Sequence, residues 1–239
     1  MTRFATKDAA RGHVWDRLDT EGLAAFPFPP RGRIPNFRGS AQAAQRLFDI
    51  PVFRDARRIK VNPDSAQASV RAEALRRGIE VFVPTPKLAG GFWKLDPHVI
   101  PHHAIRRACA MSTMTRWAEP VALADLPQMD AIVSGSVAVT AGGKRCGKGA
   151  GYADREFAIL MELGHKPVPV ATTVHDVQIV EDFPQTVTDE PLNYIVTPTR
   201  IIEVTEPREP PAGIDWATVR EADLAEMPVL EELRHMRDR

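Results

Sequence analysis

The stretch that decides the fold is residues 131–164, AIVSGSVAVTAGGKRCGKGAGYADREFAILMELG. An apolar run ends in a loop that alternates glycines with bases, and an amphipathic helical pattern follows. Glycines let the backbone approach an anion closely, and the N–H groups and dipole at the start of a helix attract negative charge. This succession of strand, basic glycine-rich loop and helix therefore predicts a phosphate-binding site.

The loop comes close to the Walker A pattern of P-loop nucleotide hydrolases, because residues 142–148 fit GxxxxGK. The next residue of that pattern is Ser or Thr, whose hydroxyl holds Mg²⁺, whereas this chain has Gly149. The mismatch argues against a P-loop enzyme. It favours a nucleotide loop of another kind whose metal ligand lies elsewhere, and Asp154 is the nearest carboxylate.

Apolar runs on both sides of the loop predict strands, since several are continuously apolar and rich in Val and Ile. These runs are residues 58–61, 80–84, 131–139, 168–174 and 194–202. Strands that alternate with helices indicate an α/β domain in three layers, with a mostly parallel sheet flanked by helices. Ligands of such folds bind at the carboxyl ends of the strands, where the glycine-rich loop lies.

Helical patterns alternate with these runs. They cover residues 40–49, with Ser40 as N-cap, residues 66–77 and residues 153–163. The last two patterns end at Gly78 and Gly164, which are typical helix C-cap residues.

Proline-rich segments divide the chain. Residues 26–35, FPFPPRGRIP, cannot form a regular helix or a central strand, so we expect an ordered arm between an N-terminal helix and the core. Residues 207–213 form a second break, after which Asp215 caps a short helix and Pro228 starts another over residues 229–236. We therefore expect one α/β domain over residues 1–205 and a C-terminal helical extension over residues 206–239.

Composition is that of an ordinary globular protein, with 239 residues, 44% hydrophobic and 26% charged, and a formal net charge of zero. Neutrality gives no argument for a nucleic-acid partner. No apolar stretch approaches the roughly 18 residues of a membrane helix, and the first residues lack a signal-peptide core. The two cysteines form no metal or CxxC pattern, which favours a reduced, cytoplasmic setting and a packing role for Cys146.

Residues 143–155, GKRCGKGAGYADR, resemble the signature GxRLGxGGGYYDR of the 5-formyltetrahydrofolate cyclo-ligases, also called methenyltetrahydrofolate synthetases. The resemblance continues upstream in residues 72–84 and downstream in Pro184, Asp189 and the TP of residues 194–198. Within this family the chain is most similar to the divergent methenyltetrahydrofolate synthetase domain-containing branch. That likeness rests on WDRL near the start, RIPNF, VNPD and VPTPKL.

The resemblance implies a cyclo-ligase fold of the NagB-like type and ATP- and Mg²⁺-dependent closure of 5-formyltetrahydrofolate to 5,10-methenyltetrahydrofolate. It implies that Lys148 and Arg145 are catalytic and that Asp154 and Asp189 hold Mg²⁺. The residues that it places on ATP are Lys7, Arg11, Lys144, Arg145, Gly147, Lys148, Gly149, Gly151 and Tyr152.

The chain also departs from the family pattern. Ala150 replaces the middle glycine, Ala153 replaces the second tyrosine, and Asp64 is the nearest equivalent of the family's pterin-binding Glu before Thr. Phosphate chemistry is thus retained better than folate recognition. Two alternatives therefore stay open: an ATP-dependent enzyme acting on another small heterocycle, such as a thiamine-related one, and a non-catalytic nucleotide-binding protein. The oligomeric state is not indicated by any of these patterns.

Overall fold

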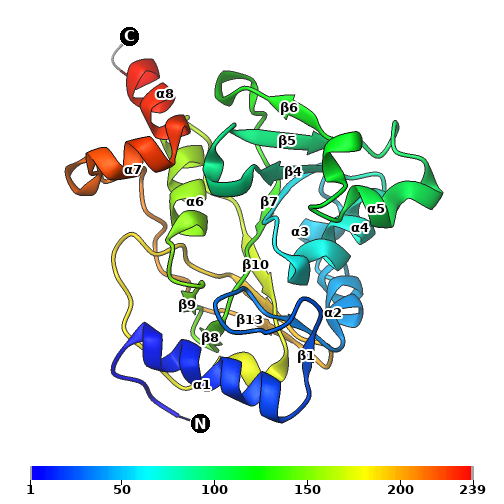
Figure 1. Cartoon of the computed structure of the whole chain (residues 1–239), viewed down its shortest axis with the longest axis vertical. Helices are drawn as coiled ribbons and strands as arrows, with labels where there is room; N and C mark the ends of the chain where they lie inside the picture. The colour runs from blue at the N-terminus through cyan, green and yellow to red at the C-terminus, as the bar shows by residue number, and fades with distance from the viewer. Residues whose placement is uncertain (1, 238–239) are drawn as a thin grey trace.

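The centre of the fold is a set of parallel strands that are largely buried on both faces, as expected for strands covered by helices on either side. The computed structural model describes residues 2–237. Its central strands, in spatial order, are β12 (Tyr194–Val196), β10 (Val170–Thr173), β7 (Ala131–Val133), β3 (Arg58–Val61) and β4 (Glu80–Pro84). Antiparallel strands complete both edges, namely β13 (Ile201–Glu203) beside β12, and β5 (Phe92–Leu95) and β6 (Glu119–Val121) beside β4 (Figure 1).

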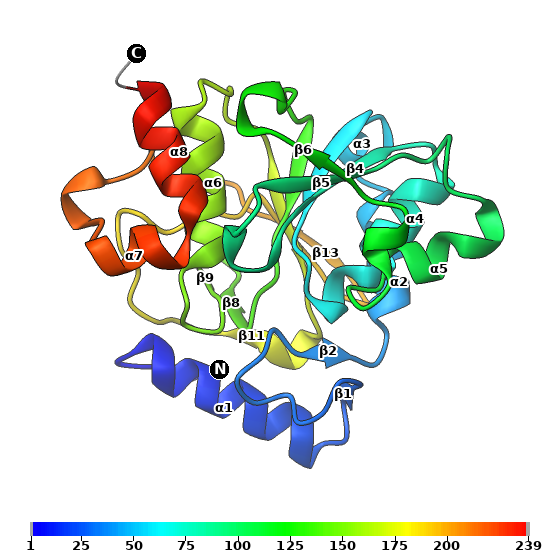
Figure 2. The same cartoon turned by 45° about the horizontal axis from the view of Figure 1, so that its top comes forward.

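Helices cover both faces of this sheet (Figure 2). One face carries α2 (Ser40–Leu47), α3 (Pro51–Arg54), α4 (Ala68–Arg76) and α5 (Ile105–Ala108), and the other carries α6 (Tyr152–Glu162), α7 (Glu221–Glu226) and α8 (Pro228–Arg237). Each layer has its own apolar cluster, one around Phe53 and Leu75 and the other around Phe157 and Leu230. The predicted three-layer α/β fold is confirmed.

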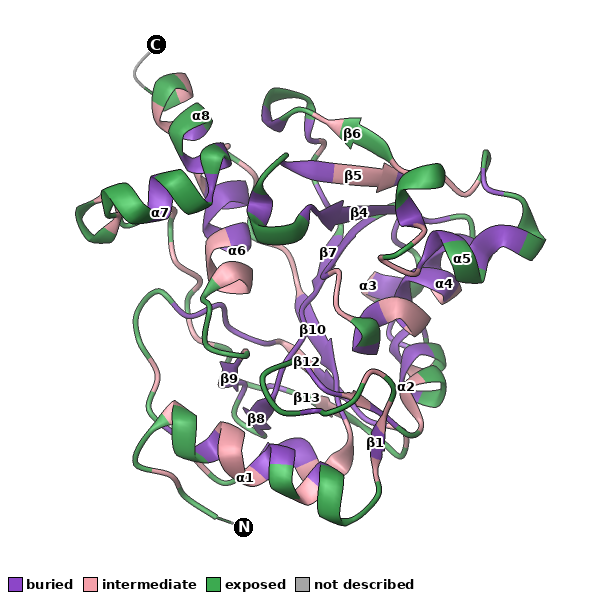
Figure 3. Cartoon of the chain, in the orientation of Figure 1, coloured by how far each residue is buried: buried purple, intermediate pink, exposed green. Residues whose placement is uncertain are grey.

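A third cluster holds the N-terminal helix against a small second sheet. α1 (Lys7–Thr20) starts at Thr6, whose Oγ1 accepts from the Ala9 N–H at 3.1 Å, and buries Val14 and Leu18. The small sheet consists of β11 (Ile179–Val180), β8 (Ala138–Thr140) and β9 (Arg145–Cys146), and a hairpin of β1 (Ala24–Ala25) and β2 (Asn36–Phe37) lies near it. Buried and exposed residues alternate along α1, so one side of this helix packs against the core and the other faces solvent (Figure 3).

Three predicted strands are wrong in extent. The run 131–139 is broken into β7 and β8, which belong to different sheets, because the chain bends away from the main sheet in the segment 134–137, which contains Gly135. A Cβ at that position would lie 2.9 Å from both Gln67 and Ile34, so the bend depends on a close approach that only glycine allows. The run 194–202 turns back after Pro198 and forms the antiparallel pair β12–β13. The run 168–174 is shortened to β10.

Helix boundaries show one clear error. Gly39 and not Ser40 is the N-cap of α2, with φ of 92°, and a Cβ there would meet Pro198 at 2.6 Å. The pattern 66–77 begins with a 3₁₀ turn at Ser65–Gln67 before α4. Gly78 and Gly164 have φ of 77° and 81°, so both predicted C-terminal glycines are confirmed.

The predicted arm, residues 26–35, contains no helix or strand, as expected. After residue 206 the chain forms a 3₁₀ turn at Trp216–Thr218 and then α7 and α8, with Pro228 as the first residue of α8. The division into a domain and an extension at residue 205 stays a prediction. Within residues 2–237 no helix is both long enough and apolar enough to cross a membrane.

Candidate functional site

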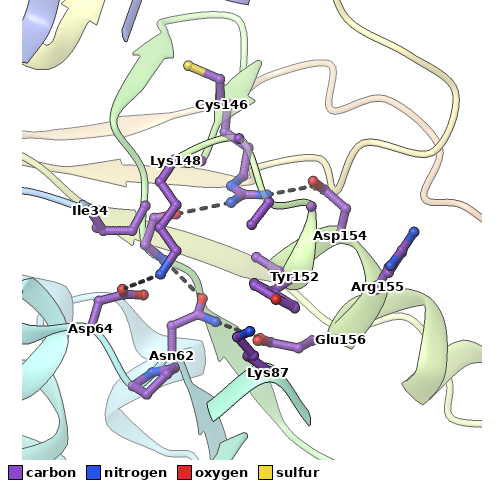
Figure 4. Close-up of a pocket in the computed structure, with 18 of the residues that line it drawn as sticks. Ile34, Asn62, Asp64, Lys87, Cys146, Lys148, Tyr152, Asp154, Arg155 and Glu156 are labelled. Carbon is purple, nitrogen blue, oxygen red and sulfur yellow. Dashed lines mark hydrogen bonds and ion pairs between the residues drawn. The ribbon is translucent and has the colours of Figure 1, made fainter. Parts of the chain in front are cut away.

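A cavity of about 870 Å³ opens between the glycine-rich loop, the start of α6, the proline-rich arm and the C-terminal segment. Figure 4 shows Lys148 and Asp64 facing each other across part of it. Almost all predicted site residues line this cavity: Lys7, Arg11, Asp64, Arg145, Gly147, Lys148, Gly149, Gly151, Tyr152, Asp154 and Asp189. Residues from both ends of the chain are thereby brought to one place.

Lys144 is the predicted site residue that the structure does not bring to the cavity. Its Nζ donates to Asp182 Oδ1 at 2.6 Å and to the Phe183 carbonyl at 3.3 Å. The physical reason is the alternation of side chains along extended chain, which sends consecutive residues to opposite faces. Arg145, the next residue, therefore points inward while Lys144 points away.

The loop from Gly147 to Gly151 carries unpaired backbone donors. Among residues 2–237, none of its N–H groups donates to a protein acceptor. Gly149 has φ of 109°, and Gly151, with φ of 69°, is the N-cap of α6 and supplies no side-chain cap. Arg11 holds the loop in place, since its Nε donates to the Gly147 carbonyl at 2.6 Å. Free N–H groups at the start of a helix form an anion-binding concavity.

Ala150 does not strain this loop. Among the described non-glycine residues, positive φ occurs at Lys87 and Leu88, so Ala150 keeps a conformation that any residue adopts. The departure from the family glycine at this position therefore does not distort the backbone of the anion-binding concavity.

Arg145 is buried beneath the loop, with 2% of its side chain exposed. Its Nη1 donates to Asp154 Oδ1 at 2.8 Å and lies 3.3 Å from Glu190 Oε2, and its Nη2 donates to the Gly135 carbonyl at 3.1 Å. Burial lowers the pKa of Arg145, but the charges of Asp154 and Glu190 outweigh it, and the net shift is upward. Arg145 is thus a fixed cation that orients Asp154.

The two predicted metal ligands differ in how they are engaged. Asp154 Oδ1 accepts from Arg145 and from the Glu190 N–H at 3.0 Å, whereas no described group contacts Oδ2. Asp189 Oδ1 and Oδ2 each accept from Lys7 Nζ at 2.6 Å, and Thr186 donates to both as well. Burial raises the pKa of Asp189, but these hydrogen bonds outweigh it and leave the pKa below its ordinary value.

Within residues 2–237 no group of three or more His, Cys, Asp or Glu side chains is arranged to hold a metal ion. Mg²⁺ at nucleotide sites needs only one or two carboxylates, because phosphate oxygens and water supply the remaining ligands. The free Oδ2 of Asp154, beside unpaired loop donors, fits that requirement. Asp189 fits it only if Lys7 moves to another anion.

A buried polar network lies beside Asp64 in the cavity wall. Asn62 and Asp64 follow β3, and the buried guanidinium of Arg71 donates to both of their carbonyls. Burial lowers the pKa of Arg71 to about 10. Asn62 Nδ2 donates to Glu156 Oε2 at 2.5 Å, and Asp64 Oδ1 lies 3.8 Å from Lys148 Nζ.

The C-terminal segment closes one side of the cavity, and its lining residues are Gly213, Ile214, Asp215, Thr218, Val219 and Leu230. Glu162 on α6 fixes this segment, because its carboxylate accepts from Trp216 Nε1 at 3.0 Å and from the Ile214 N–H at 3.1 Å. Tyr152, which the resemblance places on ATP, lines the cavity, and its hydroxyl donates to Glu226 Oε1 at 2.8 Å.

Sequence reasoning missed Asn62, Glu156, Glu190 and the C-terminal wall. A signal existed for Glu156, since a glutamate directly before the apolar run of residues 157–161 occupies the buried face of the predicted helix. A signal also existed for Asn62, a polar residue at the carboxyl end of a buried strand. The C-terminal wall had no such local signal.

Comparison with known proteins gives the same family as the sequence motifs. Methenyltetrahydrofolate synthase domain-containing proteins are similar over almost the whole chain, with 42% identity for the Mus musculus protein over 96% of this chain and 39% for the Homo sapiens protein over 96%. The chain spans 63% and 61% of the lengths of those relatives. Among solved structures, Aquifex aeolicus 5,10-methenyltetrahydrofolate synthetase has a TM-score of 0.53 at 19% identity, over 85% of this chain and 95% of that one. That likeness shows a shared fold.

The family model of the 5-formyltetrahydrofolate cyclo-ligases matches residues 21–198, which include the glycine-rich loop, α6 and the strands of the main sheet up to β12. With the loop, the cavity and these relatives in agreement, the chain belongs to the 5-formyltetrahydrofolate cyclo-ligase family.

Proposed function

We propose that this protein is an ATP- and Mg²⁺-dependent cyclo-ligase that converts 5-formyltetrahydrofolate to 5,10-methenyltetrahydrofolate, ADP and phosphate. The observation that carries the proposal is the loop Gly147–Gly151, whose unpaired N–H groups lie on the same cavity as Arg11, Lys7 and Lys148. Its volume of about 870 Å³ lies in the range of small-molecule sites. Family membership supports the reaction type.

The reaction needs an activated leaving group, because the formyl oxygen departs poorly by itself. The formyl oxygen attacks the γ-phosphorus of ATP, and the bond from that phosphorus to the ADP oxygen breaks. The N10 nitrogen then bonds to the formyl carbon and loses its proton, and the carbon–oxygen bond breaks to release phosphate. Catalysis of this kind consists mainly of positioning and charge neutralisation.

The chain offers a group for each of these tasks. The loop N–H groups cradle phosphate oxygens, and Lys7 and Lys148 neutralise charge that develops on them. Arg145 holds Asp154 through Oδ1, so Oδ2 stays free and would serve as a ligand of Mg²⁺. The bound Mg²⁺ would supply charge neutralisation between neighbouring phosphates. Asp189, released from Lys7, is the second candidate ligand.

The test combines purified protein with ATP, Mg²⁺ and 5-formyltetrahydrofolate while the near-ultraviolet absorbance of the methenyl product is followed. We expect an absorbance rise that requires both ATP and Mg²⁺. A protein that binds ATP by calorimetry but gives no methenyl product under these conditions rejects folate closure.

A second candidate is an ATP-dependent enzyme that acts on another small heterocycle, a thiamine-related one included. Two features of the cavity lining favour this candidate. Asp64, the predicted substrate-binding residue, is paired with Lys148, and Ala153 replaces an aromatic residue of the family pattern. ATP turnover with a set of heterocycles but not with folate would select this candidate. ATP binding without turnover on any of them would indicate a non-catalytic nucleotide-binding protein. A small-molecule substrate and a cytoplasmic location belong to both enzymatic proposals.

A further inference from the structure

Glu156 presents an unpaired carboxylate oxygen to the cavity. The residue is 3% exposed and lines the cavity wall, beside Asn62 (Figure 4). Its Oε2 accepts from Asn62 Nδ2 at 2.5 Å and lies 2.5 Å from Lys60 Nζ. Its Oε1 has no hydrogen-bond partner in the described part of the chain, and it is not among the fully enclosed atoms that lack one. The surface that Oε1 retains therefore faces the cavity.

The carboxylate is held rigidly in this position. Lys60, on β3, is completely buried, and its charge balances that of Glu156. A buried charge is costly unless it is paired, so the pair is maintained as a unit. Asn62 is fixed in turn, because its Oδ1 accepts from the Gly135 N–H at 3.0 Å and its carbonyl accepts from Arg71. The free oxygen is thus a preorganised acceptor.

Its chemistry selects a class of ligand. A carboxylate that is ionised can only accept hydrogen bonds, and a largely desolvated one favours N–H donors strongly while it rejects carbonyl and carboxylate oxygens. Asp64, the residue expected to bind substrate, is more exposed, at 21% of its side chain against 4% for Glu156, and Lys148 lies nearby. Glu156 is therefore the better-shielded acceptor of the two.

We propose that Glu156 is the specificity residue of this cavity and that it accepts hydrogen bonds from the N–H edge of a heterocycle of the 2-amino-4-oxopyrimidine class. The ring N–H and the adjacent amino group of such an edge offer two neighbouring donors to the two lone pairs of Oε1. The inference rests on the proposed function and names the residue that recognises the substrate ring.

The decisive variant is Glu156→Gln. Asn62 donates to Oε2 and the Lys60 ammonium lies 2.5 Å from it, so the amide oxygen of the new side chain takes that position and its NH₂ group turns to the cavity. The carboxylate oxygen that accepts is then replaced by an NH₂ group, which faces the N–H donors of the ring. For the wild type we expect KM for 5-formyltetrahydrofolate to be roughly 10- to 100-fold lower than for its 2-desamino-2-methyl analogue. In Glu156→Gln that ratio falls to within about threefold, while ATP affinity is retained.

Two further variants separate recognition from folding. Glu156→Gln leaves Lys60 unpaired, whereas Lys60→Met combined with Glu156→Gln removes the buried charge; we expect the double variant to regain thermal stability but not discrimination. Asp64→Asn is the matched control and keeps the wild-type ratio. The inference is overturned if Glu156→Gln keeps the ratio, if the double variant restores it, or if Asp64→Asn is the variant that abolishes it.

Failure of the proposed function can be distinguished from failure of this inference. If the wild type neither binds nor converts 5-formyltetrahydrofolate, wild type and Glu156→Gln are titrated calorimetrically with 2-aminopyrimidin-4-one, the smallest ring with this donor edge. Binding by the wild type that is lost in the variant supports the inference and rejects folate as the substrate. Equal binding by both proteins, or binding by neither, overturns the inference.

Discussion

The guanidinium of Arg145 donates to the carboxylate of Asp154 at 2.8 Å and so ties the strand before the glycine-rich loop to the first turn of α6. The Glu190 N–H donates to the same Asp154 oxygen at 3.0 Å. One oxygen of Asp154 is therefore committed to the fold, and the other is left for a ligand. A substitution of Asp154 can therefore remove its negative charge while its hydrogen bonds to Arg145 and Glu190 are kept.

Asp154→Asn keeps an acceptor for Arg145 but removes the negative charge. We expect little change in the thermal unfolding midpoint, but a fall of about tenfold in the affinity for ATP in the presence of Mg²⁺. Calorimetric titration with ATP, with Mg²⁺ and with a chelator, measures this difference. Asp182→Asn is the matched control, since Asp182 pairs with Lys144 away from the cavity, and its ATP affinity should stay unchanged. Undiminished Mg²⁺-dependent binding by Asp154→Asn would remove Asp154 from the metal site.

Arg145→Met removes the cation that neutralises Asp154 and Glu190. Loss of one partner from a buried ion pair costs about 3–5 kcal/mol, because the remaining charges are left uncompensated. Urea unfolding of Arg145→Met should show a loss of this size. Adding Glu190→Gln should recover part of it, since Glu190 is completely buried and its Oε2 lies 3.3 Å from Arg145. Losses that simply add would show that the two groups are not coupled.

Substitutions of Lys7 and Lys144 test where ATP binds, because both lysines are predicted to contact ATP and only Lys7 lies at the cavity. Lys7 pairs with the buried Asp189 at the cavity, whereas Lys144 pairs with Asp182 outside it. We expect Lys7→Gln to weaken ATP binding roughly 5- to 10-fold and Lys144→Gln to leave it within about twofold. Calorimetry at low and at physiological salt provides both comparisons. A larger effect from Lys144→Gln would reverse the assignment.

His175 makes stability depend on pH. Its Nδ1 accepts from the Val177 N–H at 3.3 Å, and burial lowers the pKa of this imidazole below its ordinary value. The unfolded chain therefore binds the proton more readily, and the free energy of unfolding should fall as pH drops below about 6.5. His175→Asn retains an acceptor that does not titrate, so it should flatten this decline. Urea unfolding at pH 7.5 and pH 5.5 provides the measurement, with the exposed His103→Asn as control. An identical decline in wild type and His175→Asn would contradict it.

Local patterns in the sequence predict the phosphate loop and much of the sheet. β4 coincides with its predicted run because its centre, residues 81–83, is continuously apolar, as in a buried parallel strand. β3 coincides as well, although it carries the buried Lys60 between Ile59 and Val61. Gly151 and Gly164 bound α6 because their conformations require glycine. These features are determined by residues that are adjacent in the sequence, so the sequence alone can predict them.

Other features depend on contacts between distant residues. The break after β7 requires Gly135 to pack against Gln67 and Ile34. The partner of Glu156 is Lys60, which lies far away in the sequence, so the pair could not be found from spacing. The family resemblance predicts that Lys144 binds ATP, and its contact with Asp182 becomes visible only in the folded chain.

The proposed reaction is tested most directly by the fate of the formyl oxygen. The protein is mixed with ATP, Mg²⁺ and 5-formyltetrahydrofolate that carries oxygen-18 in the formyl group, and the released phosphate is examined by mass spectrometry. We expect oxygen-18 in phosphate, in amounts equal to the methenyl product, because the formyl oxygen leaves as part of the phosphate. Methenyl product with unlabelled phosphate, or phosphate release without methenyl product, would contradict the proposed cyclo-ligase reaction.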